Sequence, residues 1–180
     1  IINDIDGVQF SSTDPAQSLD RALLSELSAY AAENRLFLEW GGGEHIPLDP
    51  ATGKPKDIFA INKKAAEQAH ALGVTTVRST SGGQMRWNAR SLPTEEILRL
   101  TAKGLNEQKK MLSDLGVVLA LETRPDFTTF EFLRLFDMCR VNPGECFGIC
   151  LDTMNLLTML EDPVAATERI LPWIVTTHIK

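Results

Sequence analysis

Several features that define common protein classes are scarce or missing in this sequence. The 180 residues contain three cysteines, an odd number without a paired C-x-x-C arrangement, which argues against a disulfide framework. No apolar stretch approaches the roughly 20 residues that span a bilayer, and the start of the chain lacks a signal-peptide pattern. We therefore expect a cytoplasmic protein with no membrane partner, in which Cys139, Cys146 and Cys150 are reduced and buried.

A cluster of positive charge is also missing. The net charge is -6, and a surface that binds nucleic acid normally needs a basic footprint, so we expect no nucleic-acid partner. A small anionic substrate needs only a few local cations. The hydrophobic share of 43% and the charged share of 23% are typical of a folded globular protein. The length predicts a single domain over residues 1–180.

Short apolar segments typical of buried strands alternate with helical patterns along the chain. The six predicted strands are Ile5–Phe10, Arg35–Trp40, Val74–Ser79, Val117–Glu122, Phe147–Asp152 and Ile174–His178. Five predicted helices start near Asp14, Asp57, Thr94, Thr128 and Asp162. This alternation predicts an α/β fold with a parallel sheet. It fits both an open doubly wound sheet and a closed (β/α)8 barrel, and the pattern alone does not choose between them.

Local signals predict the ends of several helices. Thr128 and Glu131 form a capping box, and Thr94 is predicted to cap one continuous helix that ends at Gly116. The first helix is expected to bury four residues at helical spacing, which are Leu19, Leu23, Leu27 and Tyr30. One connection, Gly41–Lys56, is unusually long, and its histidine, His45, is expected to be solvated.

Three predicted strands end on side chains that can bind a metal ion. These residues are Glu122, Asp152 and His178. The carboxyl ends of parallel strands lie on one rim of a sheet, so side chains far apart in sequence can meet there. Two carboxylates and an imidazole suit Mn²⁺, Mg²⁺ or Co²⁺, and also Zn²⁺. The competing interpretation is that each carboxylate caps the next helix or pairs with a nearby arginine.

The ordered set of strand-end segments resembles the sugar phosphate isomerase/epimerase family of xylose-isomerase-like barrels. The segments that carry the resemblance are DIDGVQF (residues 4–10), LALETRPDF (119–127), GICLDTMNLL (148–157) and THIK (177–180). In that family the corresponding Glu, Asp and His bind one divalent metal together with a second Glu from the last strand. The resemblance implies that Glu122, Asp152 and His178 are ligands and that the fourth ligand has no counterpart here.

The resemblance also implies an incomplete (β/α)8 TIM barrel that lacks the first and last strands, with residues 4–10 matching the second strand. The implied activity is a metal-dependent isomerase or epimerase of a sugar or sugar phosphate, with Mn²⁺ as the first choice of ion. Glu122 would act both as a ligand and as a catalytic acid or base. Arg124 and Asn155 depart from the family, since histidine is common at both positions, and this leaves the substrate open.

Substrate contacts are predicted around the same rim. Arg78, Arg124 and Lys180 follow or end strands and could bind a phosphate or carboxylate group. They are equally suited to balance the charge of the carboxylates. Trp87 could shield a sugar from water, and Asn155 stands three residues after Asp152.

Two other functions remain open at this point. A dehydratase of the inosose or dehydroshikimate type would use the same metal and base but expel water. A non-catalytic, incomplete barrel would serve as a binding module, and such a chain could form a homo-oligomer. An apurinic endonuclease, which needs many histidine ligands and a DNA-binding surface, is disfavoured by three histidines and an acidic chain.

Overall fold

The structure, a computed structural model, describes residues 6–11, 21–80 and 85–179. In this part of the chain six parallel strands form one curved sheet, and their order in space follows their order in sequence. The strands are β1 (Gly7–Gln9), β2 (Phe37–Glu44), β3 (Thr76–Thr80), β4 (Val118–Glu122), β5 (Phe147–Asp152) and β6 (Ile174–His178). A doubly wound sheet would reverse the strand order at one point. The sheet is therefore a half-barrel, and the prediction of an incomplete barrel is confirmed.

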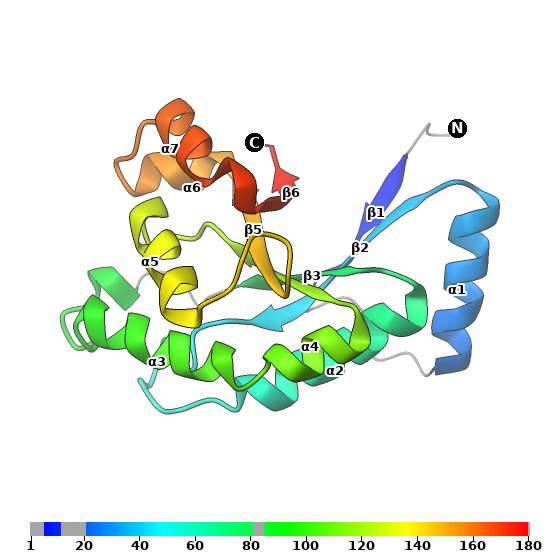
Figure 1. The fold of residues 1–180 in the computed structure, drawn as a ribbon, viewed down its shortest axis with the longest axis horizontal. Helices are drawn as coiled ribbons and strands as arrows, with labels where there is room; N and C mark the ends of the chain where they lie inside the picture. The colour runs from blue at the N-terminus through cyan, green and yellow to red at the C-terminus, as the bar shows by residue number, and fades with distance from the viewer. Residues whose placement is uncertain (1–5, 12–20, 81–84, 180) are drawn as a thin grey trace.

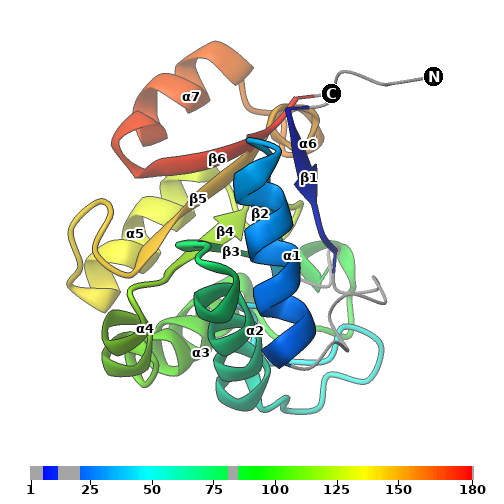
Figure 2. The ribbon, with the colours of Figure 1, turned by 90° about the vertical axis from the view of Figure 1, so that its right-hand side faces the viewer.

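Helices follow the strands and lie on the outer side of the curved sheet (Figures 1 and 2). They are α1 (Arg21–Glu33), α2 (Ile58–Leu72), α3 (Thr94–Asn106), α4 (Lys109–Leu115), α5 (Thr129–Cys139), α6 (Thr153–Thr158) and α7 (Pro163–Ile170). Helix α2 packs on β2 and β3, while α3 packs on α5. Among the described helices, none combines the length and apolar character that crossing a membrane requires.

Side chains alternate between the two faces of the sheet, as strand geometry requires. On β4, Leu119 and Leu121 join the apolar core that the helices cover, whereas Ala120 and Glu122 belong to the opposite, inner face. The ladder pairs Glu122 with Cys150 and Asp152 with His178. This register brings the last residues of β4, β5 and β6 to one rim of the half-barrel.

Strand β2 is longer than predicted, because it continues through three glycines to Glu44. The register shifts between Trp40 and Gly43, where the strand bulges. A Cβ at Gly43 would lie 3.0 Å from Ser79 Cβ and 3.2 Å from the Arg78 carbonyl oxygen of the neighbouring strand β3, so the bulge leaves little room for a side chain there. The predicted long loop over 41–56 is therefore wrong in its first part.

The predicted helix from Thr94 to Gly116 is two helices. The chain breaks at Gln108, whose buried side chain donates from Nε2 to the Gly104 carbonyl oxygen at 2.9 Å and accepts from Asn62 Nδ2 at 2.7 Å. Thr94 is the first helical residue, and its predicted capping role is wrong. Helix α6, which begins directly after β5, was not predicted.

The buried face of α1 also differs from the prediction. Leu24 and Ala31 are buried, and the predicted Leu27 packs partly buried against the core, whereas Leu23 and Tyr30 are 45% and 58% exposed. Leu19 lies outside the described residues. Helix α1 packs mainly against α2 rather than centrally on the sheet. The buried side of α1 is therefore displaced by about one residue along the helix from the predicted side.

Other helix signals are confirmed. Thr128 and Glu131 form the reciprocal capping box, and the rings of Phe127 and Phe132 meet edge to face at 5.8 Å. Asp57 caps α2, and Asp162 caps α7. These contacts are local in sequence, which explains why the pattern alone was sufficient.

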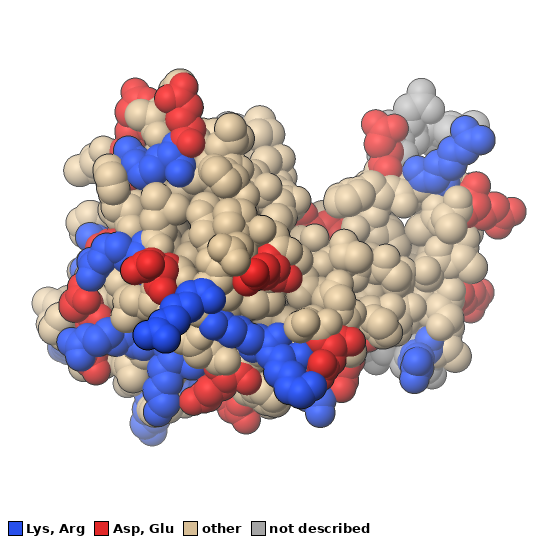
Figure 3. Space-filling view, viewed as in Figure 1, with Lys and Arg blue, Asp and Glu red and all other residues tan. Residues whose placement is uncertain are grey.

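The half-barrel is open between its edge strands β1 and β6. The space-filling view shows a hollow between the part of the molecule that carries α6 and α7 and the part that carries β1 and α1 (Figure 3). A cavity of about 670 Å³ lies along this seam, and its lining includes Gln9, Glu39 and His178. At this seam Gln9 is exposed, whereas Glu39 and the deeper residues Glu122 and Asp152 are buried.

Candidate metal centre

Glu122, Asp152 and His178 converge at the rim formed by β4, β5 and β6. Each offers one ligand atom, and these three atoms all lie within 4.8 Å of one another. Glu122 and Asp152 are buried, while the side chain of His178 is 12% exposed. The convergence follows from the ladder, because Glu122 is paired with Cys150 and Asp152 with His178. Residues distant in sequence thus form one compact group of two carboxylates and an imidazole.

The two oxygens of Glu122 have different surroundings. Oε2 accepts a hydrogen bond from Arg78 Nη1 at 3.0 Å. Oε1 lies 3.8 Å from His178 Nδ1 and 3.9 Å from Arg124 Nη1. Arg78 thus offsets the charge of the buried carboxylate at Oε2, and Oε1 faces the imidazole of His178.

Asp152 has a second role that the sequence also allowed. Its Oδ1 accepts from the backbone N–H groups of Met154 at 3.1 Å and Asn155 at 3.4 Å, and so caps α6. The Asp152 backbone is held in turn by Thr123, whose Oγ1 accepts from the Asp152 N–H at 2.8 Å. The competing interpretation as a helix cap is therefore correct for Oδ1. These bonds hold the carboxylate in a fixed orientation at the strand end.

A buried carboxylate that the sequence pattern did not reveal lies one layer below this group. Glu39 of β2 is 3% exposed, and its Oε1 lies 3.4 Å from His178 Nε2 and 3.7 Å from Arg78 Nε. Thr176 Oγ1 and Gln9 Nε2 also donate to it. A charged residue inside the apolar segment RLFLEW was the available signal, since glutamate is almost never buried unless it is paired.

The donor set fits a divalent cation. Mg²⁺ binds oxygen at about 2.1 Å, so opposite ligands of an octahedral ion lie about 4.2 Å apart; the three ligand atoms, within 4.8 Å of one another, would move slightly closer together on binding one ion. Carboxylate oxygens with one imidazole suit Mn²⁺, Mg²⁺, Co²⁺ or Zn²⁺. One oxygen of each carboxylate is held by the protein: Glu122 Oε2 accepts from Arg78, and Asp152 Oδ1 accepts from the backbone at the N-terminus of α6.

The predicted substrate residues occupy different environments. Arg78 is 9% exposed and is engaged by Glu122 and Glu39, which matches the charge-balancing alternative. Arg124 lies at the rim with a side chain 37% exposed, and its buried Nε has no hydrogen-bond partner among the described residues. Arg124 is therefore the better placed of the two for an anionic substrate group.

The remaining predicted contacts are spread around the rim. Trp87, in a short 3-10 helix over Met85–Trp87, is 60% exposed. Asn155 is half-buried in the first turn of α6, next to the cap formed by Asp152. Lys180 lies outside the described residues. The structure thus brings Asn155 and Arg124 near the three strand ends, and it leaves Trp87 on the surface.

His45 is buried, so the expectation that it is solvated is wrong. Its Nδ1 lies 2.8 Å from Ser79 Oγ, and Nε2 has no partner among the described residues. Burial, with the nearby charges of Lys56 and Arg124, lowers the pKa of His45 from 6.5 to about 3. The imidazole is therefore neutral at physiological pH.

The cysteines are free and buried, as expected. Burial raises the pKa of the Cys139 thiol to about 11 and raises those of Cys146 and Cys150 as well. The pKa of Cys150 is raised further by the negative charges of Glu39 and Glu122, which share its face of the sheet. The thiols are thus held in the neutral form.

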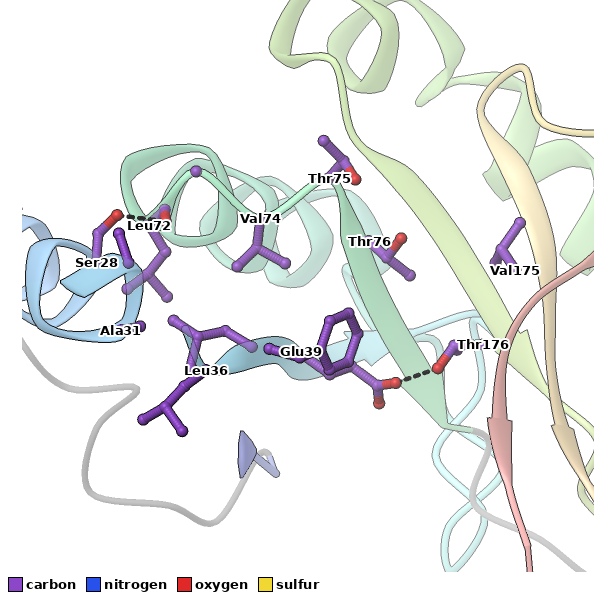
Figure 4. A pocket seen from close by; sticks show the side chains of 14 residues that line it. Ser28, Ala31, Leu36, Glu39, Leu72, Val74, Thr75, Thr76, Val175 and Thr176 are labelled. Atoms are coloured by element: carbon purple, nitrogen blue, oxygen red, sulfur yellow. Dashed lines mark hydrogen bonds between the residues drawn. The ribbon is translucent and has the colours of Figure 1, made fainter. Parts of the chain in front are cut away.

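A second cavity, of about 550 Å³, lies at the amino-terminal end of the strands. Figure 4 shows the residues that line it, among them Leu36, Leu72 and Val74. Glu39 and Thr176 also line this cavity, and the dashed line between them marks their hydrogen bond. It is on the opposite end of the sheet from the three strand ends. Ligands in barrels of this kind bind at the carboxyl ends, so this cavity is a gap in the packing below the candidate site.

The chain belongs to the xylose isomerase-like TIM barrel family, whose match covers residues 3–180. A comparison with curated proteins finds no sequence match.

Solved structures share the fold. A D-psicose 3-epimerase with D-tagatose, from Clostridium cellulolyticum H10, superimposes with a TM-score of 0.77 at 15% identity, over 98% of this chain and 63% of that one. The IOLI protein with a bound zinc atom has a TM-score of 0.74 at 17% identity, over 97% and 62%. A probable 3-DHS dehydratase, AsbF from Bacillus anthracis, has a TM-score of 0.70 at 15% identity, over 96% and 62%. This chain thus spans less than two thirds of the length of these structures.

Proposed function

We propose that this chain carries the metal-binding part of a divalent-metal-dependent isomerase or epimerase that acts on a sugar or sugar phosphate. The observation that carries the proposal is the convergence of Glu122, Asp152 and His178 within 4.8 Å from three strand ends. Mn²⁺ is the first candidate for the ion, with Mg²⁺, Co²⁺ and Zn²⁺ as alternatives. The zinc atom bound by the IOLI protein, which has the same fold, supports a metal in this chain.

When bound, the ion would polarise a carbonyl oxygen and stabilise the negative charge that develops as a neighbouring C–H bond loses its proton. Glu122 would accept that proton, because its Oε1 faces the site while Arg78 holds Oε2. Asp152 and His178 would hold the ion. Arg124 and Asn155 would bind the substrate from the rim. Trp87, and Lys180, which follows His178 by two residues in the sequence, are further candidates for substrate contact.

The substrate class rests on the fold and on the chemistry of the donor set. One protein of similar structure, the D-psicose 3-epimerase, was solved with D-tagatose, a ketose in which a C–H bond lies next to a carbonyl group. Arg124 provides a cation at the rim that would favour a phosphorylated or carboxylated substrate. Neutral ketoses and substrates with a phosphate or carboxylate group both fit this chemistry, so the assay should compare these two classes directly.

A dehydratase is the second candidate, favoured by the similarity to the probable 3-DHS dehydratase. The same base would remove a proton next to a carbonyl group, and a hydroxyl group would then leave as water. The two activities differ only in their products. Product analysis by NMR therefore distinguishes them, since an epimerase leaves the formula of the substrate unchanged.

The first experiment measures metal content after chelation and reloading with Mn²⁺. We expect near-stoichiometric metal in the native chain, none in His178→Ala, and native content in His70→Ala, which removes an exposed imidazole from α2. The reloaded chain is then incubated with ketoses and keto acids in D₂O. Deuterium uptake next to the carbonyl group that disappears in Glu122→Gln would support the proposal. Equal metal content in the native chain and His178→Ala would contradict it.

A further inference from the structure

Glu39 lies on the side of His178 that faces away from Glu122. His178 Nδ1 is 3.8 Å from Glu122 Oε1, whereas His178 Nε2 is 3.4 Å from Glu39 Oε1. The imidazole of β6 thus lies between two buried carboxylates, 2% and 3% exposed, which come from β4 and β2. Nδ1 is the nitrogen on the side of the candidate metal centre.

We propose that Glu39 is a positioning residue that fixes the tautomer and ring orientation of His178, so that Nδ1 presents its lone pair to the metal. This inference rests on the proposed function, because it assigns a role within the same site. An imidazole that binds a metal through one nitrogen carries its proton on the other, and that N–H group is usually held by a carboxylate or carbonyl oxygen. An ionised carboxylate can only accept, so Glu39 favours the form with the proton on Nε2.

Glu39 is itself held firmly enough to act in this way. Thr176 Oγ1 donates to Oε2, and Gln9 Nε2 donates to Oε1. Arg78 Nε lies 3.7 Å from Oε1, and the same guanidinium donates to Glu122 from Nη1. Arg78 therefore links the two carboxylates that bracket His178, and it offsets the charge of both.

Gln9 is the competing partner for the same nitrogen. Its Nε2 contacts His178 Nε2 as well as Glu39. An amide N–H that donated to His178 Nε2 would require the proton on Nδ1, and this tautomer cannot bind a metal through Nδ1. The proposal therefore predicts different effects for the two neighbours: loss of Glu39 reduces the population of the tautomer that can bind the metal, and loss of Gln9 leaves that tautomer in place.

The test reads the tautomer of His178 directly by long-range ¹H–¹⁵N NMR of the metal-free full chain at about pH 8. The chain has three histidines, so comparison with His178→Ala assigns the signals. We expect the Nε2–H form in the native chain, and a shift toward the Nδ1–H form or a mixture in Glu39→Gln. Thr176→Val removes a hydrogen bond to Glu39 but keeps the carboxylate, and Gln9→Leu removes the competitor. Both variants should keep the native tautomer.

Metal affinity provides the second measurement. The Kd for Mn²⁺ should rise about 10- to 100-fold in Glu39→Gln, the usual effect of losing such an outer partner, and should change little in Thr176→Val. If Glu39→Gln does not fold, as judged by circular dichroism, Glu39→Asp replaces it, since it keeps the charge beside Arg78 but withdraws the oxygen from Nε2. A partial shift of the tautomer is expected there.

The outcomes separate this inference from the proposed function. A native chain in the Nδ1–H form, or an unchanged tautomer in both Glu39 variants, would overturn the inference even if Mn²⁺ binds. A tautomer that depends on Glu39 in a chain that binds no Mn²⁺ would support the inference and refute the proposed function. Loss of Mn²⁺ binding with the tautomer unchanged would make Glu39 a ligand, and the positioning role would be wrong.

Discussion

Arg78 Nη1 donates a hydrogen bond to Glu122 Oε2 at 3.0 Å, and both side chains are almost fully buried, at 11% and 2% exposure. The same guanidinium reaches Glu39, so a single cation offsets two carboxylates inside the half-barrel. A buried ion pair gives little net stability, but removing one partner leaves an uncompensated charge. Arg78 therefore reduces the repulsion between the buried carboxylates of Glu39 and Glu122.

Replacing Arg78 by methionine should lower the free energy of unfolding by about 3 to 5 kcal/mol, because Glu39 and Glu122 would lose their shared cation. Urea unfolding measures this loss. Arg134→Met is the control: it breaks an exposed pair with Glu95 and should cost less than about 1 kcal/mol. A saturating divalent cation should restore part of the stability of Arg78→Met, about 2.7 kcal/mol at a concentration 100 times its Kd. Equal losses in the two variants would contradict this account.

Thr128→Ala should lower the free energy of unfolding by about 1 kcal/mol, because the α5 capping box loses its side-chain acceptor for the Glu131 N–H. Thr94→Ala is the matched control, since Thr94 is the first residue of α3 and makes no capping hydrogen bond. Thermal or urea unfolding of both variants tests the difference. A larger effect at Thr94 would mean that the helix starts are assigned wrongly.

His45 should make the folded chain sensitive to acid. Its pKa is lowered from 6.5 to about 3 in the folded state, so between these values the unfolded state binds a proton that the folded state does not. Stability is therefore unaffected by His45 above pH 6.5, and it falls by about 1.4 kcal/mol for each pH unit below that value until about pH 3.

The measurement is the free energy of unfolding at several pH values between 4 and 7, for the native chain and for His45→Leu. The variant should lose less stability on acidification than the native chain, because it lacks the proton-binding group. Identical slopes for the two proteins would show that the imidazole is not held in the neutral form.

The three thiols should resist alkylation in the folded chain. They are buried and unpaired, and a raised pKa suppresses the reactive thiolate at all three. With iodoacetamide at about pH 8, mass spectrometry should find almost no adducts in native conditions and three per chain in denaturant. Rapid labelling of Cys150 in the folded chain would indicate that the inner face of the half-barrel is open to reagents.

Much of the candidate site could be predicted from the sequence, because each of its three main residues ends an apolar strand. That Glu122, Asp152 and His178 meet depends only on the strands being parallel and in register, which is a regular property of the fold. Glu39 could not be placed in the same way. Its partner His178 is 139 residues away, and the contact crosses the interior of the half-barrel rather than following a ladder.

His45 and Gln108 show the same limit. Nothing in the sequence distinguishes either residue from an exposed polar residue. Each is buried with a hydrogen bond to a residue of another segment: His45 Nδ1 with Ser79 Oγ, and Gln108 Oε1 with Asn62 Nδ2. Burial of a polar group depends on which segments pack over it, and local pattern does not contain that information.

The alternation of strands and helices, the caps at Asp57, Thr128 and Asp162, and the residues at the strand ends could all be read from the sequence, because each shows in a local pattern of a few residues. The order of the strands, the bulge in β2 and the position of His178 between Glu39 and Glu122 became known from the folded chain and not from local pattern. A helix cap is formed by residues a few positions apart, and the polarity pattern that marks a strand can be read along the chain even though its hydrogen bonds go to other strands. The interior of a barrel is formed by side chains that meet only after the whole sheet has curved.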